Sequence, residues 1–234
     1  MASAPGLETR LAWSAWCRGF SHPESGPANN QVTLPSSLRR RISAIGQRAF
    51  RASWTLSEQR DARFVFCSRY GEMDRTLRIL HSLSAAEPVS PADFSLSVHN
   101  ALAGLLSIAW RNTEGHTAIS AGDESFGYGL LEAGACLTRR TDEAVMLVYF
   151  DDVLAPPYDE FAGGTEPCVA LAMLLKPSRN GSGDFILTLE PGEGVASISP
   201  SISQPLAFLK FMAAGEPALT WAGDRKLWRW RRCD

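Results

Sequence analysis

Short apolar runs between polar turns predict the strands of this chain. The run 143–150, EAVMLVYF, is the most apolar one and lacks the alternation of a strand with one solvated face. Such runs are typical of strands that helices cover on both faces, and 62–68 has the same character. The turn SRNGSGD predicts a hairpin between the apolar run 168–176 and the half-buried strand 185–190. Further strands are expected at 10–18 and 116–120.

Apolar residues three or four positions apart predict the helices. In 71–83 the side chains of Met73, Leu77, Leu80 and Leu83 share one face. The range 92–110 is expected to form a single helix of about five turns. Its stripe consists of Phe94, Val98, Leu102, Leu105 and Ala109. Helices are also expected at 36–52, 124–138 and 201–214. The basic and aromatic tail 221–234 shows no clear period.

Strands that alternate with helices and end in a hairpin predict an α/β protein. We expect a mixed five-stranded sheet with helices on both faces, followed by a C-terminal hairpin and helix. The 234 residues contain 45% hydrophobic and 21% charged residues, which is the usual balance of a globular protein. No repeat and no linker divides the chain, so one domain over residues 1–234 is predicted.

Charge and hydropathy exclude several classes of partner. The formal net charge is −2, so no basic field favours nucleic acid. No apolar run reaches the roughly 18 residues of a membrane span. The start MASAPGLETR lacks the basic and apolar stretches of a secretory signal, and a cytoplasmic protein is expected. The five cysteines and four histidines are scattered, so neither a disulfide framework nor a metal site is predicted. No cofactor is expected.

The segment AGDESFGYG at 121–129 joins a short strand to a helix and is the first candidate site. Asp123 is a good N-cap and Glu124 suits a first helical turn, so capping is one interpretation. The other is a nucleophile at a helix N-terminus. A hydrolase elbow would have Gly-x-Ser-x-Gly, but Asp123 stands where the first glycine would be, two residues before Ser125. No histidine can be paired with Ser125 from spacing alone.

Three further features have ordinary structural interpretations. Asp151 and Asp152 follow the most apolar strand, where a ligand could bind, but without a third ligand a solvated loop start is expected. His99 is expected to be a structural histidine. The tail WRWRR at 228–232 is expected to pack, with arginine stacked on tryptophan.

The stretch VSPADFSLSVHNALAGLLSIAWRNTEGHTAISAGDESFG, 89–127, resembles the β-ketoacyl synthase family of thiolase-fold condensing enzymes. The family pattern is Ser-Pro-x-x-Phe, then Asn-x-x-Ala-Gly-x-x-(Ser/Thr)-Ile, a short strand, and Thr-Ala-Cys-x-Ser-Gly. The matching positions here are Ser90, Pro91, Phe94, Asn100, Ala103, Gly104, Ser107, Ile108 and Ser125. The strand 143–152 also resembles the family. The resemblance implies half of a thiolase-like fold, with a family-like core at 10–176 and an extension at 177–234.

Two departures from the family imply a role without catalysis. The register places Asp123 at the position of the nucleophilic cysteine, and a carboxylate cannot form the thioester that condensation requires. The two catalytic histidines of the family lie in a C-terminal half that this chain is too short to contain. Chain-length factors share the first departure, and the truncated form resembles the short ketosynthase-like subunit of aryl polyene pathways. The alternative is an acyltransferase or hydrolase that uses Ser125 or Asp123.

The resemblance also implies a partner and its contacts. The partner would be a full-length β-ketoacyl synthase, with acyl carrier protein met indirectly. The strand before the nucleophile position would pair with the partner's strand, and its residues are His116, Thr117, Ala118, Ile119 and Ser120. Tyr70, Met73 and Leu77 are expected to gate the partner's acyl tunnel, or else to be ordinary core contacts. The extension 177–234 could cover the face that the missing half leaves open.

Overall fold

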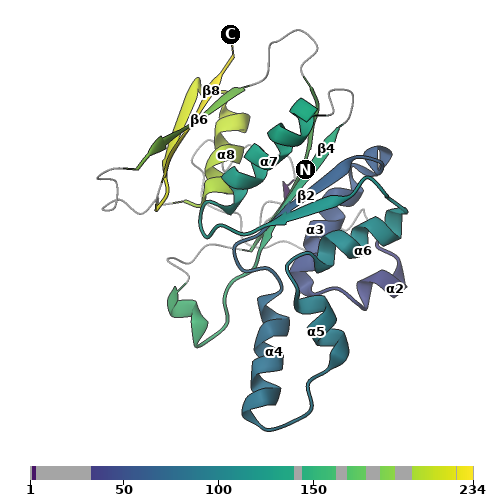
Figure 1. Ribbon diagram of the computed structural model, residues 1–234. Helices are drawn as coiled ribbons and strands as arrows, with labels where there is room; N and C mark the ends of the chain where they lie inside the picture. The colour runs from purple at the N-terminus through teal and green to yellow at the C-terminus, as the bar shows by residue number, and fades with distance from the viewer. Residues whose placement is uncertain are drawn as a thin grey trace.

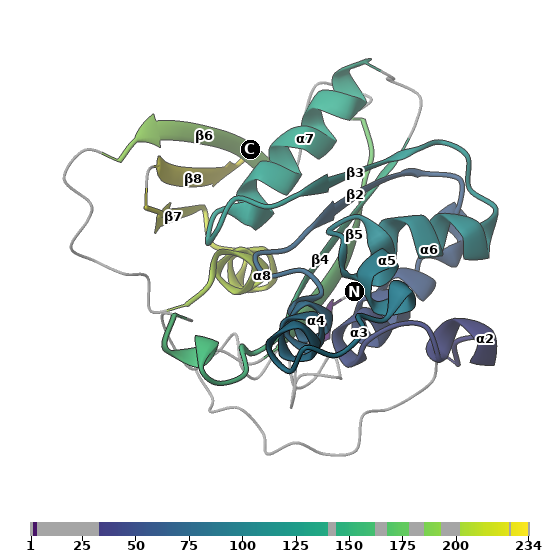
Figure 2. The same ribbon diagram turned by 60° about the horizontal axis from the view of Figure 1, so that its bottom comes forward.

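The computed structural model describes residues 2–3, 33–139, 144–161, 168–177, 185–192, 202–224 and 226–233. A five-stranded mixed sheet forms the centre, in the order β1-β5-β4-β2-β3 (Figures 1 and 2). Its strands are β1 (Ala2–Ser3), β2 (Arg63–Cys67), β3 (His116–Ile119), β4 (Val145–Asp151) and β5 (Val169–Leu175). β2 runs parallel to β3 and β4, whereas β5 runs antiparallel to β4 and β1. The strand expected at 10–18 lies outside the described residues.

Two helices, α3 (Ala44–Trp54) and α6 (Ala101–Trp110), cover one face of the sheet. Side chains such as Phe50 and Leu106 are buried there against Phe64 and Phe66 of β2. α3 begins at its N-cap Ser43, whose hydroxyl accepts a hydrogen bond from the Gly46 N–H. The short helix α2 (Ser36–Arg39) precedes it.

The other face packs against α7 (Ser125–Arg139), α8 (Gln204–Ala214) and a second, three-stranded sheet. That sheet has the order β6-β8-β7 (Figure 2). Its strands are β6 (Phe185–Pro191), β7 (Ala218–Ala222) and β8 (Lys226–Arg232). Phe126, Phe208, Trp228 and Trp230 are fully buried in this layer, so the second half of the chain forms a core of its own against the sheet.

Helices α4 (Met73–Ser84) and α5 (Pro91–Ser97) pack on each other and project from one end of the molecule (Figure 1). The side chain of Arg75 ties them to the body. Its guanidinium donates to Glu72 at 2.9 Å, to Asp93 at 2.9 Å and to the Arg41 carbonyl at 2.6 Å. Two short 3-10 turns, Ser57–Gln59 and Tyr158–Phe161, complete the described elements.

The predicted fold class is confirmed: the chain is an α/β protein with helices on both faces of a mixed five-stranded sheet. The predicted hairpin between 168–176 and 185–190 is wrong, because β5 pairs with β4 and β6 pairs with β8 in the other sheet. The physical reason is visible in burial. β5 begins with four buried residues, whereas β6 alternates between half-buried and exposed side chains and so suits a sheet with one solvated face.

Two predicted helices are divided in the structure. The helix expected at 92–110 is two helices, α5 and α6, because Val98 has an extended backbone with ψ of 145°. Phe94 and Val98 are consequently exposed, while Leu102 and Leu105 are buried. The helix expected at 36–52 is α2 followed by α3.

Candidate functional site

A tight turn, Ser68–Gly71, follows β2 at the carboxyl edge of the sheet and is built around Asp151 at the end of β4. The Asp151 carboxylate accepts hydrogen bonds from the Ser68 hydroxyl at 2.8 Å, from the Arg69 N–H at 2.9 Å and from the Tyr70 N–H at 3.0 Å. The Tyr149 hydroxyl donates to its other oxygen. Asp151 is therefore not the solvated loop start that was expected. It fixes the backbone of the turn that carries Tyr70.

Burial raises the pKa of Asp151, and the four hydrogen bonds to it oppose that rise. Gly71 closes the turn with a φ of +62°, which glycine adopts without strain. The Gly71 N–H donates to the Ser68 hydroxyl at 2.6 Å. The turn is thus defined from both ends by buried polar contacts.

Asp123 lies in the turn between β3 and α7, and its carboxylate forms an ion pair with the guanidinium of Arg69. The interpretation of Asp123 as the N-cap of α7 is wrong, because the helix begins at Ser125 and the carboxylate faces Arg69. Burial is the main cause that raises the pKa of Asp123, Asp224 and Glu124 add to the rise, and Arg69 lowers it. Glu124 is buried instead of exposed in a first turn, and it accepts a hydrogen bond from the Lys226 N–H at 3.1 Å.

Ser125 is fully buried, and both roles of its hydroxyl are taken by the turn. The oxygen accepts from the Ala121 N–H at 2.9 Å and its proton goes to the Gly122 carbonyl at 2.6 Å. A nucleophilic serine would instead give that proton to a base. This geometry is that of a structural hydroxyl.

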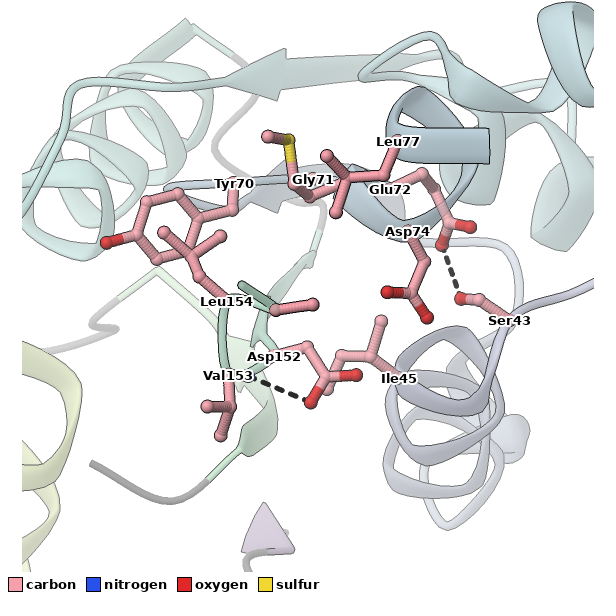
Figure 3. A pocket seen from close by; sticks show the side chains of 12 residues that line it. Ser43, Ile45, Tyr70, Gly71, Glu72, Asp74, Leu77, Asp152, Val153 and Leu154 are labelled. Atoms are coloured by element: carbon pink, nitrogen blue, oxygen red, sulfur yellow. Dashed lines mark hydrogen bonds between the residues drawn. The ribbon is translucent and has the colours of Figure 1, made fainter. Parts of the chain in front are cut away.

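Tyr70, Met73 and Leu77, which were singled out from the sequence, line one common pocket. In Figure 3 Tyr70 and Leu154 lie at one end of this pocket, and Ser43, bonded to Glu72, lies at the other. Tyr70 and Met73 are half-buried and Leu77 is buried. The structure thus brings together three residues from the turn and from α4, next to the loop that follows β4.

β3 is the last strand at its end of the sheet, and among the described residues no strand pairs with its outer edge. The Gly115 and Ile119 carbonyls accept hydrogen bonds from β2 and its continuation at Ser68. Because backbone groups alternate in direction along a strand, the N–H and C=O of His116 and Ala118 point outward. A shallow groove between this strand end and α7 lies beside them. Its lining residues are Ile119, Ser120, Ala121, Tyr128, Leu131, Glu132 and Ala135.

The projecting α4–α5 pair exposes large apolar side chains. Leu83 is 59% exposed and Phe94 is 64% exposed, and Leu80 and Val98 are exposed as well. The apolar face predicted for 71–83 is therefore buried only at its N-terminal end, around Leu77. Exposed apolar residues that gather on one projection are typical of a contact surface.

The remaining candidates have structural roles. The His99 ring Nε2 lies 2.9 Å from the Ile119 carbonyl oxygen, as expected for a structural histidine. Trp228 and Trp230 are buried and stack on each other, with ring centroids 6.1 Å apart. In the described tail, the guanidinium of Arg232 lies over the ring of Phe211. Among the described residues no group of three His, Cys, Asp or Glu side chains could hold a metal ion. No helix in the described ranges is long and apolar enough to span a membrane.

Sequence reasoning missed two residues of this region, Ser68 and Arg69. They contact Asp151 and Asp123, which lie 83 and 54 positions further along the chain. No local spacing signals such pairs. The only sequence signal was the position of these residues directly after a buried strand, where the carboxyl ends of parallel strands meet.

Comparison with known proteins defines the class and then the family. A chain in the solved structure "Ketosynthase (ApeO) in Complex with its Chain Length Factor (ApeC) from Xenorhabdus doucetiae" is 29% identical, with a TM-score of 0.82 over 99% of this chain and 96% of that one. A β-ketoacyl synthase from Burkholderia phymatum STM815 shares the fold at 13% identity and a TM-score of 0.59, covering 92% of this chain and 69% of that one. The fold is therefore thiolase-like. No curated protein matches the chain.

The family follows from a second comparison. Residues 13–231 match the family "Beta-ketoacyl synthase, N-terminal domain". The chain belongs to this family.

Proposed function

We propose that this chain is a non-catalytic, chain-length-factor-like subunit that pairs with a full-length β-ketoacyl synthase in fatty acid or polyketide-type biosynthesis, of the aryl polyene kind. The observation that carries the proposal is the likeness to one chain of the ApeO–ApeC complex. This likeness extends over nearly the whole length of the present chain and of the matched chain. The subunit would work in the cytoplasm, stabilise the synthase and shape its acyl tunnel. It would meet acyl carrier protein through the synthase.

The chemistry around Asp123 supports a role without catalysis. Condensation needs a thiolate that accepts the acyl group and imidazoles that assist the carbanion step. The residue expected at the thiolate position is Asp123, and its carboxylate is engaged by Arg69. Cys67, which directly precedes the Ser68–Gly71 turn, is fully buried in the sheet, and burial raises the pKa of its thiol. We therefore expect no condensation by this chain alone.

No specific observation favours the alternative of a hydrolase or acyltransferase. The Ser125 hydroxyl donates to the Gly122 carbonyl, so its proton is not held by a base. The carboxylate of Asp123 pairs with a cation instead of activating a hydroxyl.

Two features of the surface support docking to a synthase. From His116 to Ser120, the outer edge at β3 offers backbone groups that no strand among the described residues pairs with, and an antiparallel strand of the partner would satisfy them. The exposed apolar side chains of α4 and α5 supply area that a stable interface of well over about 1,000 Å² requires. The proposed interface thus combines a strand edge with an apolar projection.

The pocket lined by Tyr70, Met73 and Leu77 supports the proposed effect on chain length. An aromatic ring and a flexible thioether suit the floor of an apolar tunnel, because they fill space without demanding polar partners. We further propose that residues 177–234 form an extension that covers the core of residues 10–176. In its described part, Trp228 and Phe208 pack against α7.

Co-expression with the full-length ketosynthases of the same pathway tests the proposal. We expect a stable 1:1 complex in size-exclusion chromatography with light scattering. The complex should form condensation product from acyl and malonyl carrier protein, and the isolated chain should form none. A chain that stays monomeric with every such ketosynthase, or that condenses alone, would contradict the proposal. Asp123→Cys should not create activity in the isolated chain.

A further inference from the structure

Arg69 is the residue on which three separate segments meet. Its guanidinium pairs with Asp123 from the turn before α7 and donates to the Phe161 carbonyl at 3.4 Å. The carbon at the centre of the same guanidinium lies 4.6 Å from the centroid of the Tyr70 ring. At this distance the guanidinium and the face of the Tyr70 ring attract each other through a cation–π interaction.

The two carboxylates of this region hold different parts of the turn. Asp151 binds the backbone N–H groups of Arg69 and Tyr70, which fixes the chain but leaves the torsions of the tyrosine side chain free. Among the described residues, the Tyr70 hydroxyl has no hydrogen-bond partner. The Arg69 guanidinium is therefore the polar group that holds the ring.

We propose that Asp123 is a positioning residue that holds the Arg69 guanidinium over the Tyr70 ring and thereby sets the place of that ring at the wall of the pocket. The negative charges of Asp224 and Glu124 lie near the Asp123 carboxylate and repel it. The Arg69 guanidinium offsets this repulsion, which favours the Asp123–Arg69 ion pair. The electrostatic environment of Tyr70 shows the same neighbours. Burial raises the pKa of Tyr70, Arg69 lowers it, and Asp123 and Asp151 raise it further.

The Asp123 and Arg69 side chains are 39% and 25% exposed, so their pair is partly solvated and its loss should leave the fold intact. The effect of Asp123 on Tyr70 can therefore be measured in folded protein. The full chain contains four tyrosines and can be labelled with 3-fluorotyrosine. The fluorine resonance of Tyr70 is the one that Tyr70→Phe removes.

A double-mutant cycle tests whether Asp123 acts through Arg69. We expect Asp123→Asn and Arg69→Gln each to move the Tyr70 resonance, and Asp123→Asn to move it much less in the Arg69→Gln background than in the wild type. Asp224→Asn is the matched control, since it removes a nearby charge that does not pair with Arg69, and it should leave the resonance in place. Asp123→Glu, which keeps the carboxylate, should preserve most of the native shift.

An unmoved Tyr70 resonance in Asp123→Asn, or an equal movement with and without Arg69, would overturn the inference. Should Asp123→Asn fail to fold, Asp123→Ser supplies the same comparison. The link to product length rests on the proposed function and is measured separately, in the assembled complex with a ketosynthase. If the resonance moves and product length does not, the positioning role stands and the tunnel gate fails. If Tyr70→Ala changes product length while Asp123→Asn leaves the resonance unmoved, the gate stands and the positioning role fails.

Discussion

Gly127 of α7 lies directly against the indole of Trp228: a Cβ placed on this glycine would be 2.5 Å from the ring carbon Cζ3. The Gly127 N–H also donates to the buried Gln204 side chain at 2.7 Å. The helix that begins at the candidate site is therefore in backbone contact with both α8 and β8.

Replacing Gly127 with alanine should destabilise the protein. The added methyl would press on a fully buried ring, and overpacking of this kind costs about 1–3 kcal/mol. Gly134 in the same helix is the matched control, because a Cβ there meets nothing within 4 Å. Gly134→Ala should stabilise by about 0.5–1 kcal/mol. Urea unfolding of the two variants measures both effects, and equal stabilities would show that Trp228 does not define this contact.

The strands of the central sheet could be predicted because their signal is local. The ranges 62–68, 116–120, 143–150 and 168–176 agree with β2, β3, β4 and β5 within one or two residues. Because helices cover both faces of this sheet, its inner strands consist of continuous apolar runs that the sequence shows directly. The pairing of the strands was harder to predict from the sequence. The hairpin predicted for β5 and β6 rested on the turn between them, but β5 pairs with β4 and β6 pairs with β8.

The last strand, β8, shows a signal that was present but overlooked. Trp228 and Trp230 are buried, whereas Arg229 between them and Arg231 after them are exposed, which is the period of two that a strand with one solvated face requires. The density of arginine and tryptophan hid this alternation. The ion pair of Arg69 and Asp123 had no such signal, because 54 positions separate the two residues and only the folded sheet brings them together.

The edge of β3 gives a sharp prediction for assembly. Ala118→Pro removes an N–H that points away from β2, so the intramolecular ladder keeps its hydrogen bonds while the proposed partner strand loses a donor. We expect loss of the complex with the ketosynthase, measured by size-exclusion chromatography, and an unchanged circular dichroism spectrum of the chain. Ala118→Ser keeps the N–H and should assemble normally. A fully assembled Ala118→Pro complex would place the interface elsewhere.

Stability should depend on pH through Asp151. Burial raises the pKa of Asp151 above its ordinary 3.8, so between that value and the raised one the folded state holds a proton that the unfolded state has lost. Stability contributed by this group therefore falls as pH rises through that window. Asp151→Asn lacks the titration, so its deficit relative to the wild type should be largest below the ordinary pKa of 3.8 and should shrink as pH rises toward neutral.

Tyr149→Phe is the companion variant for this test. It removes a hydrogen bond that lowers the pKa of Asp151, so the same fall in stability should extend to higher pH. Unfolding free energies at a series of pH values measure both variants. A wild-type protein whose stability relative to Asp151→Asn increases with pH would reverse the sign and refute the raised pKa.

Product length gives the most direct measure of the pocket. Tyr70 is half-buried at the pocket wall, and its hydroxyl has no hydrogen-bond partner in the part of the chain that the structure describes. If its ring closes the partner's tunnel, Tyr70→Ala should lengthen the products of the complex by a two-carbon step or more. Met73→Trp, one turn further on, should shorten them. Tyr70→Phe keeps the ring and should leave the product distribution unchanged.

A core role for these residues predicts a different pattern. Tyr70→Ala would then cost roughly 3–5 kcal/mol and lower the yield of complex without moving product length. Leu77, which is buried, is the internal reference: Leu77→Ala should lower stability whichever role Tyr70 has. Mass spectrometry of the products, set beside the yield of purified complex for each variant, separates the two roles. An unchanged product distribution from a fully assembled Tyr70→Ala complex would exclude the gate.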